Sequence, residues 1–120
     1  KALERASAEI DKGNSVFIFP EATISKKAPE LLPYKNGAFK LAIEKQIPIL
    51  PVVFIDNFQR LQNGGFFKAN GSIGFIRTII LEPISTKGMT ESNVDELKNK
   101  TFDTINNTLR NHYDKERKVL

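Results

Sequence analysis

The pattern of apolar and polar residues predicts a helix and then a buried strand at the start of the chain. Apolar residues recur at helical spacing over residues 2–12, and Gly13 follows as a C-terminal stop. Residues 16–19, Val-Phe-Ile-Phe, form an unbroken apolar run, which is typical of a strand buried on both faces of a parallel sheet. Pro20 lacks an amide hydrogen and therefore ends the strand pairing.

The next segments predict a second helix and a second strand. Residues 22–33 are rich in Ser, Lys and Pro and have no periodicity, which indicates a loop. A helix is predicted from residue 36 or 37 to about residue 45, and a short apolar strand over 52–55. A strand, helix and strand in this order form a βαβ unit with parallel strands. We therefore expect an α/β fold with a mixed, mainly parallel sheet flanked by helices.

The second half of the chain predicts a hairpin and a long helix. Asn70-Gly71 favours a two-residue turn before a strand over 72–81. Ser92 and Asp95 have the spacing of a capping pair at the start of a helix over about 93–116. No repeat and no interdomain linker is visible, so we expect residues 1–120 to form a single domain fragment. The apolar stripe of the long helix comprises Val94, Leu97, Phe102, Ile105, Leu109 and Tyr113.

Composition narrows the function classes. The 120 residues, 40% hydrophobic and 27% charged, are typical of one globular domain or part of one. The absence of cysteine excludes disulfides and thiolate metal sites, and we expect no metal and no nucleic-acid partner. The longest apolar run, residues 47–55, contains two prolines and is far shorter than the ~20 residues of a membrane span. The net charge of +4 favours contact with anionic membranes or phosphates, although such a charge commonly serves solubility alone.

Candidate binding residues follow the first predicted strand. Glu21 comes directly after Pro20, at the edge of an open α/β sheet where ligands bind. Thr23 and Ser25 offer hydroxyls that could cap a turn or bind a phosphate or glycerol oxygen. Lys35 stands near Gly37, where a backbone without a side chain can approach a ligand closely; alone, Lys35 would be read as a solvated lysine.

Three short blocks, in order, resemble the glycerolipid acyltransferase family. They are Phe19-Pro-Glu-Ala-Thr-Ile-Ser25, Tyr34-Lys-Asn-Gly-Ala-Phe39 and Ile47-Pro-Ile-Leu-Pro-Val52. The corresponding family blocks are Phe-Pro-Glu-Gly-Thr-Arg-Ser, Phe-Lys-x-Gly-Ala-Phe and Val-Pro-Ile-x-Pro-Val. Each block is weak evidence alone, but three at the family's spacing are strong.

The resemblance implies an enzyme of phospholipid biosynthesis at the cytoplasmic face of a membrane. Such an enzyme moves a fatty acyl group from acyl-CoA or acyl-ACP to the free hydroxyl of a lysophospholipid such as lysophosphatidate. It needs no cofactor besides the acyl donor. The expected partners are the lysophospholipid acceptor, the acyl donor and the membrane surface. The residues that would place the glycerol phosphate are Glu21, Thr23, Ser25, Lys35 and Gly37.

The chain departs from the family in three respects. The family's His-x-x-x-x-Asp dyad, whose histidine is the general base, is missing, because the one histidine is His112 and position 117 is Arg117. Ile24 replaces an arginine, which removes a two-pronged phosphate contact. Ala22 replaces a glycine, and alanine fits there only if its φ is negative.

We therefore expect the substrate-binding half of an acyltransferase domain, in a chain that begins after the catalytic part and contains no catalytic residue. The alternative is a non-catalytic α/β module that binds a phosphate-bearing ligand or an anionic membrane surface. A His-x-x-x-x-Asp pair upstream in the full-length chain would favour the enzyme. A nucleotide-binding domain is disfavoured, because no glycine-rich loop follows the first predicted strand.

Overall fold

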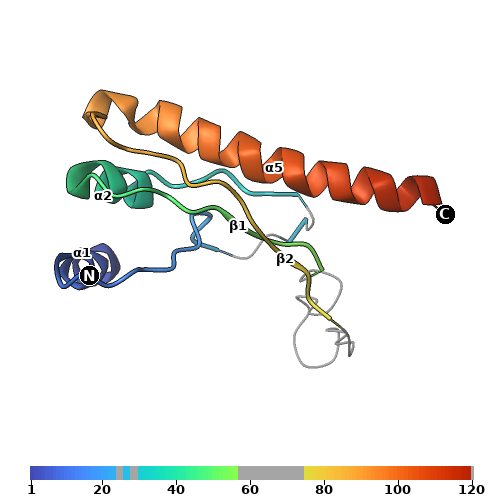
Figure 1. Ribbon diagram of the computed structural model, residues 1–120, viewed down its shortest axis with the longest axis horizontal. Helices are drawn as coiled ribbons and strands as arrows, with labels where there is room; N and C mark the ends of the chain where they lie inside the picture. Colours follow the sequence, from blue (N-terminus) through green and yellow to red (C-terminus); the bar gives the residue numbers. More distant parts are fainter. Residues whose placement is uncertain (24–25, 28–29, 57–74, 120) are drawn as a thin grey trace.

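The fold places one long helix over a two-stranded sheet and two short helices (Figure 1). This computed structural model describes residues 1–23, 26–27, 30–56 and 75–119. The elements in chain order are α1 (Ala2–Asp11), α2 (Gly37–Lys45), β1 (Val52–Phe54), β2 (Thr78–Ile80), the 3₁₀ helix η1 (Glu91–Asn93) and α5 (Val94–Val119).

Helices α1 and α2 lie side by side and run in the same direction. Leu3, in the first turn of α1, lies so close to Gly37 that a Cβ atom there would be 2.5 Å from Leu3 Cδ1. At the other end, Lys45 Nζ donates to both carboxylate oxygens of Asp11, at 2.7 and 2.9 Å. Gly13, with φ +86°, follows α1 in the left-handed conformation that glycine tolerates. Both helices and the Gly13 stop are as predicted.

The sheet is antiparallel. Val52, Val53 and Phe54 of β1 pair with Ile80, Ile79 and Thr78 of β2. Ile49 and Ile84 extend the ladder by exchanging two hydrogen bonds of 2.9 and 2.8 Å. The predicted strands over 52–55 and 72–81 are thus present, in shorter form, where the chain is described. The predicted turn at 70–71 lies outside the described residues.

The predicted buried strand over 16–19 is wrong for this chain, and the mainly parallel sheet is not confirmed. Residues 14–19 carry no strand assignment, and the side chains of Phe17 and Phe19 are 60% and 67% exposed. The Phe17 ring lies 6.2 Å from the ring of Phe54, so this segment passes beside β1. A strand needs hydrogen-bonding partners along its edge. Within the described ranges, the ladder of β1 is formed with β2 alone.

Helix α5 begins at Val94, close to the predicted start, but the cap lies two residues before the predicted one because a 3₁₀ helix precedes α5. The 3₁₀ helix η1 leads into α5, and its cap is a reciprocal pair between Thr90 and Asn93 rather than between Ser92 and Asp95. The Thr90 N–H donates to Asn93 Oδ1 at 2.9 Å, and the Thr90 side chain accepts from the backbone N–H of Asn93. The extra 3₁₀ turn explains the shift, because the cap belongs to the first turn of whichever helix begins there.

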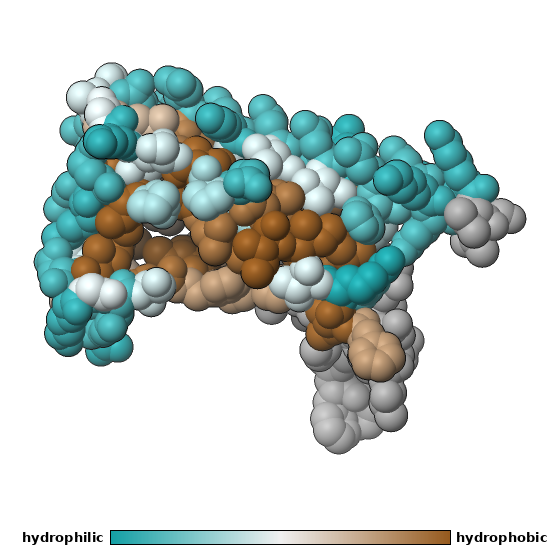
Figure 2. Space-filling model, viewed as in Figure 1, coloured by the Kyte–Doolittle hydropathy of each residue, from teal (hydrophilic) through white to brown (hydrophobic). Residues whose placement is uncertain are grey.

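The apolar stripe predicted for the long helix is confirmed and forms the centre of the core. Val94, Leu97 and Leu109 are buried, with Leu97 fully enclosed. They join two clusters, which Leu31 and Ile105 both contact and thereby connect. Figure 2 shows apolar surface below α5, across the middle of this face, and polar residues along its outer side. The clusters consist of Tyr34, Phe39, Ile43, Ile84, Val94 and Leu97, and of Val53, Ile55 and Leu109.

An ion network ties α5 to the end of the sheet. Asp56, two residues after β1, is 4% exposed. Arg77 donates to it from its backbone N–H and Nε at 2.9 Å and from Nη2 at 2.7 Å. Arg77 also contacts Glu116 of α5, and these two acidic partners raise the pKa of the guanidinium. Tyr113 donates its hydroxyl to the Ile55 carbonyl at 2.7 Å, and burial raises the pKa of Tyr113 to about 12.

Replacing Arg77 by methionine should lower the free energy of unfolding clearly more than the loss of an exposed ion pair does, because the buried Asp56 carboxylate loses its guanidinium partner. Urea unfolding of this chain measures the change. The matched control is Lys40→Ala, which removes an exposed 3.4 Å ion pair with Glu91 and should change stability by less than about 0.5 kcal/mol. Equal losses for both variants would contradict a structural role of the network.

Candidate functional site

Two hydrogen bonds bring the first and second sequence blocks together. The Lys35 N–H donates to the Pro20 carbonyl at 2.8 Å. The Leu32 N–H donates to Glu21 Oε2 at 2.7 Å. The loop between them therefore starts and ends at one place. Glu21 and Lys35, which are distant in sequence, stand at the two ends of this closed loop.

Glu21 is half-buried, and its known contact is to the backbone. Its Oε2 accepts the Leu32 amide hydrogen, whereas no donor in the described part of the chain reaches Oε1. Sequence reasoning did not identify Leu32 as a partner, because a backbone amide has no signature in residue type. The predicted contact of Glu21 with a ligand stays a prediction.

Lys35 is exposed and stands directly before α2. The N-cap residue of this helix, Asn36, makes no side-chain cap bond; its Oδ1 accepts instead from Lys98 Nζ at 2.8 Å. The first amides of α2 therefore have no side-chain acceptor from the N-cap residue. A helix N-terminus attracts anions through such amides and the helix dipole. Together with the Lys35 ammonium, they suit a phosphate chemically.

The remaining predicted site residues are Thr23, Ser25 and Gly37, and they differ in their surroundings and in whether the structure describes them. Thr23 is exposed in the turn after Glu21, and Ser25 and Ile24 lie outside the described residues. Gly37 begins α2, and Leu3 occupies the space beside its Cα atom. The missing side chain of Gly37 thus accommodates the packing of α1. Contact between this backbone and a ligand stays a prediction.

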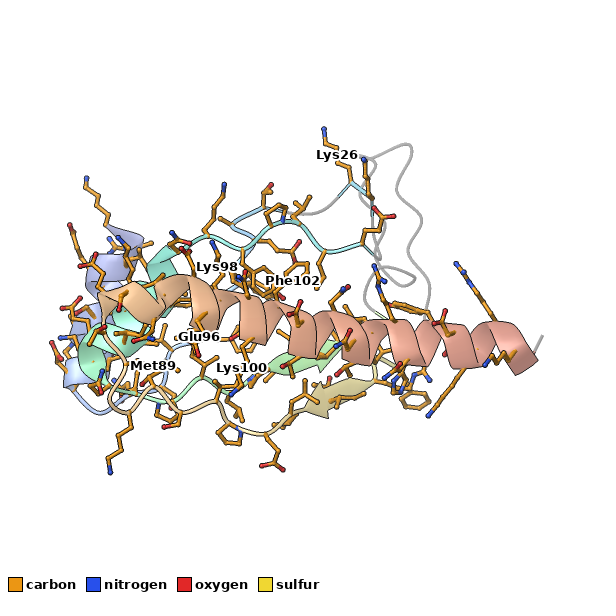
Figure 3. All side chains as sticks on the ribbon, turned by 90° about the horizontal axis from the view of Figure 1, so that it is seen from above. Lys26, Met89, Glu96, Lys98, Lys100 and Phe102 are labelled. Carbon is orange, nitrogen blue, oxygen red and sulfur yellow. The ribbon has the colours of Figure 1, made fainter. Side chains whose placement is uncertain are left out.

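Tyr34 anchors the second block in the core. Its ring stacks on Phe39 at a centroid distance of 6.2 Å and meets Phe102 of α5 edge-on at 5.0 Å. Burial raises the pKa of Tyr34, and the negative charge of Glu21 adds to the effect. Figure 3 shows Lys98 and Phe102 on the same side of α5, which faces the segment that carries Tyr34 and Asn36, while Lys26 points away from the body. Two contacts from α5 therefore fix the residues that flank Lys35.

Ala22 is in the left-handed conformation, with φ +57°. We expected alanine to fit in place of the family's glycine only if its φ were negative, and its φ is positive. The turn keeps the shape that glycine prefers, and alanine bears a steric cost of about 1–2 kcal/mol.

No described helix is both long and apolar enough to cross a bilayer. The described residues also contain no cluster of three His, Asp or Glu side chains that could hold a metal. His112 lies half-buried on α5, outside the three blocks.

Comparisons with known proteins identify the class. Residues 1–55 match the family described as Acyltransferase. The 1-acyl-sn-glycerol-3-phosphate acyltransferase of Saccharomyces cerevisiae is 36% identical over 97 residues, which cover 80% of this chain and 31% of that protein. The human 1-acyl-sn-glycerol-3-phosphate acyltransferase beta is 37% identical over 97 residues, which cover 79% of this chain and 31% of the human protein.

A solved structure supports the same fold. The 1-acyl-sn-glycerophosphate (LPA) acyltransferase PlsC from Thermotoga maritima superposes with a TM-score of 0.76 at 24% identity, covering 94% of this chain and 44% of that one. These matches place the chain among the acyltransferases. Within that class, it belongs to the glycerolipid acyltransferase family, as the three blocks indicated. It spans about a third of the length of the curated relatives it matches.

Replacing Ala22 by glycine should raise the free energy of unfolding by about 1 kcal/mol, because the left-handed φ is relieved of its steric cost. The thermal melting temperature of this chain should rise accordingly. The control is Ala8→Gly, in the middle of α1, where the same substitution should cost about 1 kcal/mol. A destabilised Ala22→Gly variant would show that the left-handed turn is absent in solution.

Proposed function

We propose that this chain is the acceptor-placing part of an enzyme that moves a fatty acyl group from acyl-CoA or acyl-ACP to the hydroxyl of lysophosphatidate or a similar lysophospholipid. The observation that carries the proposal is the closed loop between Pro20 and Lys35, which joins the first two family blocks at the start of α2. The yeast and human relatives, both 1-acyl-sn-glycerol-3-phosphate acyltransferases, support this acceptor class.

Each predicted site residue then has a task. Lys35 and the first amides of α2, including that of Gly37, hold the phosphate of the acceptor. Thr23 and Ser25 offer hydroxyls to the phosphate or glycerol oxygens, and Glu21 belongs to the same sequence block. Because Ile24 stands where the family has arginine, Lys35 carries more of the phosphate binding here than in its relatives.

The reaction is one acyl transfer without a covalent enzyme intermediate. The acceptor hydroxyl loses its proton to the histidine of the family's His-x-x-x-x-Asp dyad, attacks the thioester carbonyl and expels the thiol. This chain supplies placement, which by itself contributes a large part of such a rate. The chain has no cysteine for an acyl-thioester intermediate. We place the enzyme at the cytoplasmic face of a membrane, where a lysophospholipid and the product reside.

We also propose that residues 16–19 join β1 as a parallel strand in the intact domain. One edge of β1 is hydrogen-bonded to the strand that contains β2, through backbone groups of Ile49, Pro51 and Ile55. Because backbone groups alternate along a strand, the N–H and C=O groups of Val52 and Phe54 lie on the opposite edge of β1. Phe17 already touches Phe54. We expect amide hydrogens of residues 16–19 to exchange slowly in the full-length protein and fast in this chain. Fast exchange in both proteins would refute the pairing.

The second candidate function is a non-catalytic module that binds a phosphate-bearing ligand or an anionic membrane. The net charge of +4, which favours contact with anionic phosphates and membranes, supports it. The full-length sequence decides between the two: an upstream dyad supports the enzyme, and its absence supports the binding module.

This chain alone should show no acyl transfer. A general base contributes ~10²–10⁴-fold to such reactions, and both residues of the family dyad are missing here. Release of free thiol from an acyl thioester, with lysophosphatidate present, should stay at background. Turnover that persists in the His112→Ala variant would show that the chemistry does not need the dyad.

In the full-length enzyme, Lys35→Ala should reduce kcat/KM for lysophosphatidate roughly ten- to hundredfold, as expected for one lost charge-assisted contact. Ile24→Arg should recover part of this loss, since a guanidinium can hold the same phosphate. Lys100→Ala, an exposed lysine of α5, is the matched control and should have no effect. An equal loss with an acceptor that lacks the phosphate would remove Lys35 from the phosphate site.

A further inference from the structure

We propose that Glu21 is a positioning residue for Lys35: it acts on the acceptor through the backbone of residues 31–35, and not by binding the acceptor itself. This inference rests on the proposed function and assigns a different task to the carboxylate of the first family block. It starts from the 2.7 Å bond between Glu21 Oε2 and the Leu32 N–H.

The segment around Leu32 is held from two sides. On one side, Leu31 packs against both core clusters, and Tyr34 is buried between Phe39 and Phe102. On the other side, Glu21 accepts the amide hydrogen of Leu32, which directly follows Leu31. A hydrogen bond to an ionised carboxylate is about twice as strong as a neutral one. The carboxylate therefore fixes a stretch that has no helix or strand of its own.

The backbone that follows is fixed as well, whereas the lysine side chain is left free. The Lys35 N–H is bonded to the Pro20 carbonyl, next to Glu21, and Asn36 is bonded to Lys98. The Lys35 ammonium is exposed, and no described residue pairs with it. A rigid backbone beneath a free cation is the arrangement that places charge on a ligand at low entropic cost. Glu21 maintains this arrangement from the start of the closed loop.

A positioning role and a contact role predict different behaviour for glutamine at position 21. The bond to the Leu32 N–H needs only an acceptor oxygen, which the glutamine carbonyl supplies. A direct contact that accepts two bonds from the acceptor needs both carboxylate oxygens, which glutamine cannot supply. A positioning residue should also lose its importance once Lys35 has been removed, whereas an independent contact should not.

The experiment uses the full-length enzyme and its variants Glu21→Ala, Glu21→Gln, Lys35→Ala and the double variant Glu21→Ala/Lys35→Ala. We expect Glu21→Ala to lower kcat/KM for lysophosphatidate roughly tenfold or more, and Glu21→Gln to stay within about threefold of wild type. In the Lys35→Ala background, Glu21→Ala should cost less than about threefold further. With monoacylglycerol, which lacks the phosphate, Glu21→Ala should have little effect.

Hydrogen exchange of residues 31–35 is measured on the same variants without substrate. We expect faster exchange in Glu21→Ala and rates between those of Glu21→Ala and wild type in Glu21→Gln, because the neutral amide oxygen accepts the same bond more weakly. The control is Glu30→Ala, which removes an exposed carboxylate from the same loop and should leave both activity and exchange unchanged.

Two results would overturn the proposal. Loss of activity in Glu21→Gln equal to that in Glu21→Ala, with unchanged exchange of 31–35, would make Glu21 a direct contact. Full additivity with Lys35→Ala would give the same answer. If the wild-type protein transfers no acyl group to either acceptor, the proposed function fails. The exchange data then decide the role of the Glu21–Leu32 bond independently, and unaltered exchange in Glu21→Ala would refute it.

Discussion

The burial of one stripe along α5 is the constraint on which the other elements depend. Leu97 is fully enclosed at one end of the stripe, and Leu109 is buried near the other. Between them, Ile105 contacts both core clusters. The described part of the sheet consists of two short strands and offers little apolar area of its own, whereas α2, β1 and η1 all pack against α5 (Figure 1). The capping pair of Thr90 and Asn93 starts this helix, and the Asp56–Arg77–Glu116 network holds it against the end of the sheet.

The same stripe determines where the candidate site lies. Phe102 meets the ring of Tyr34, and Lys98 holds Asn36, so the residues on both sides of Lys35 are attached to α5. Glu21 and Pro20 fix this segment from the other direction. The result is an exposed lysine on a firmly held backbone at the start of a helix. Under the proposed function, affinity for the acceptor phosphate comes from this preorganisation as much as from charge.

Two features of the chain are energetically unfavourable: the left-handed backbone of Ala22 and the exposed aromatic rings of Phe17 and Phe19. Ala22 keeps a left-handed backbone that glycine would adopt without strain, which indicates that the turn shape matters more than the residue in it. Phe17 and Phe19 expose large apolar rings, and Figure 2 shows further apolar surface on the face below α5. Exposed apolar surface of this kind marks an interface.

The sequence alone determined the helices, the stripe of α5 and the family, because helical periodicity and short motifs are local properties of the chain. It also identified Glu21 and Lys35 through their place in the family blocks. It missed Asp56, although this carboxylate follows an apolar run just as Glu21 does. The tertiary structure alone decided which strand pairs with β1, because pairing depends on the neighbour that is available and not on the apolar run itself. It likewise decided that the known partner of Glu21 is the Leu32 amide, since a backbone donor has no signature in sequence and becomes a partner only when the loop closes.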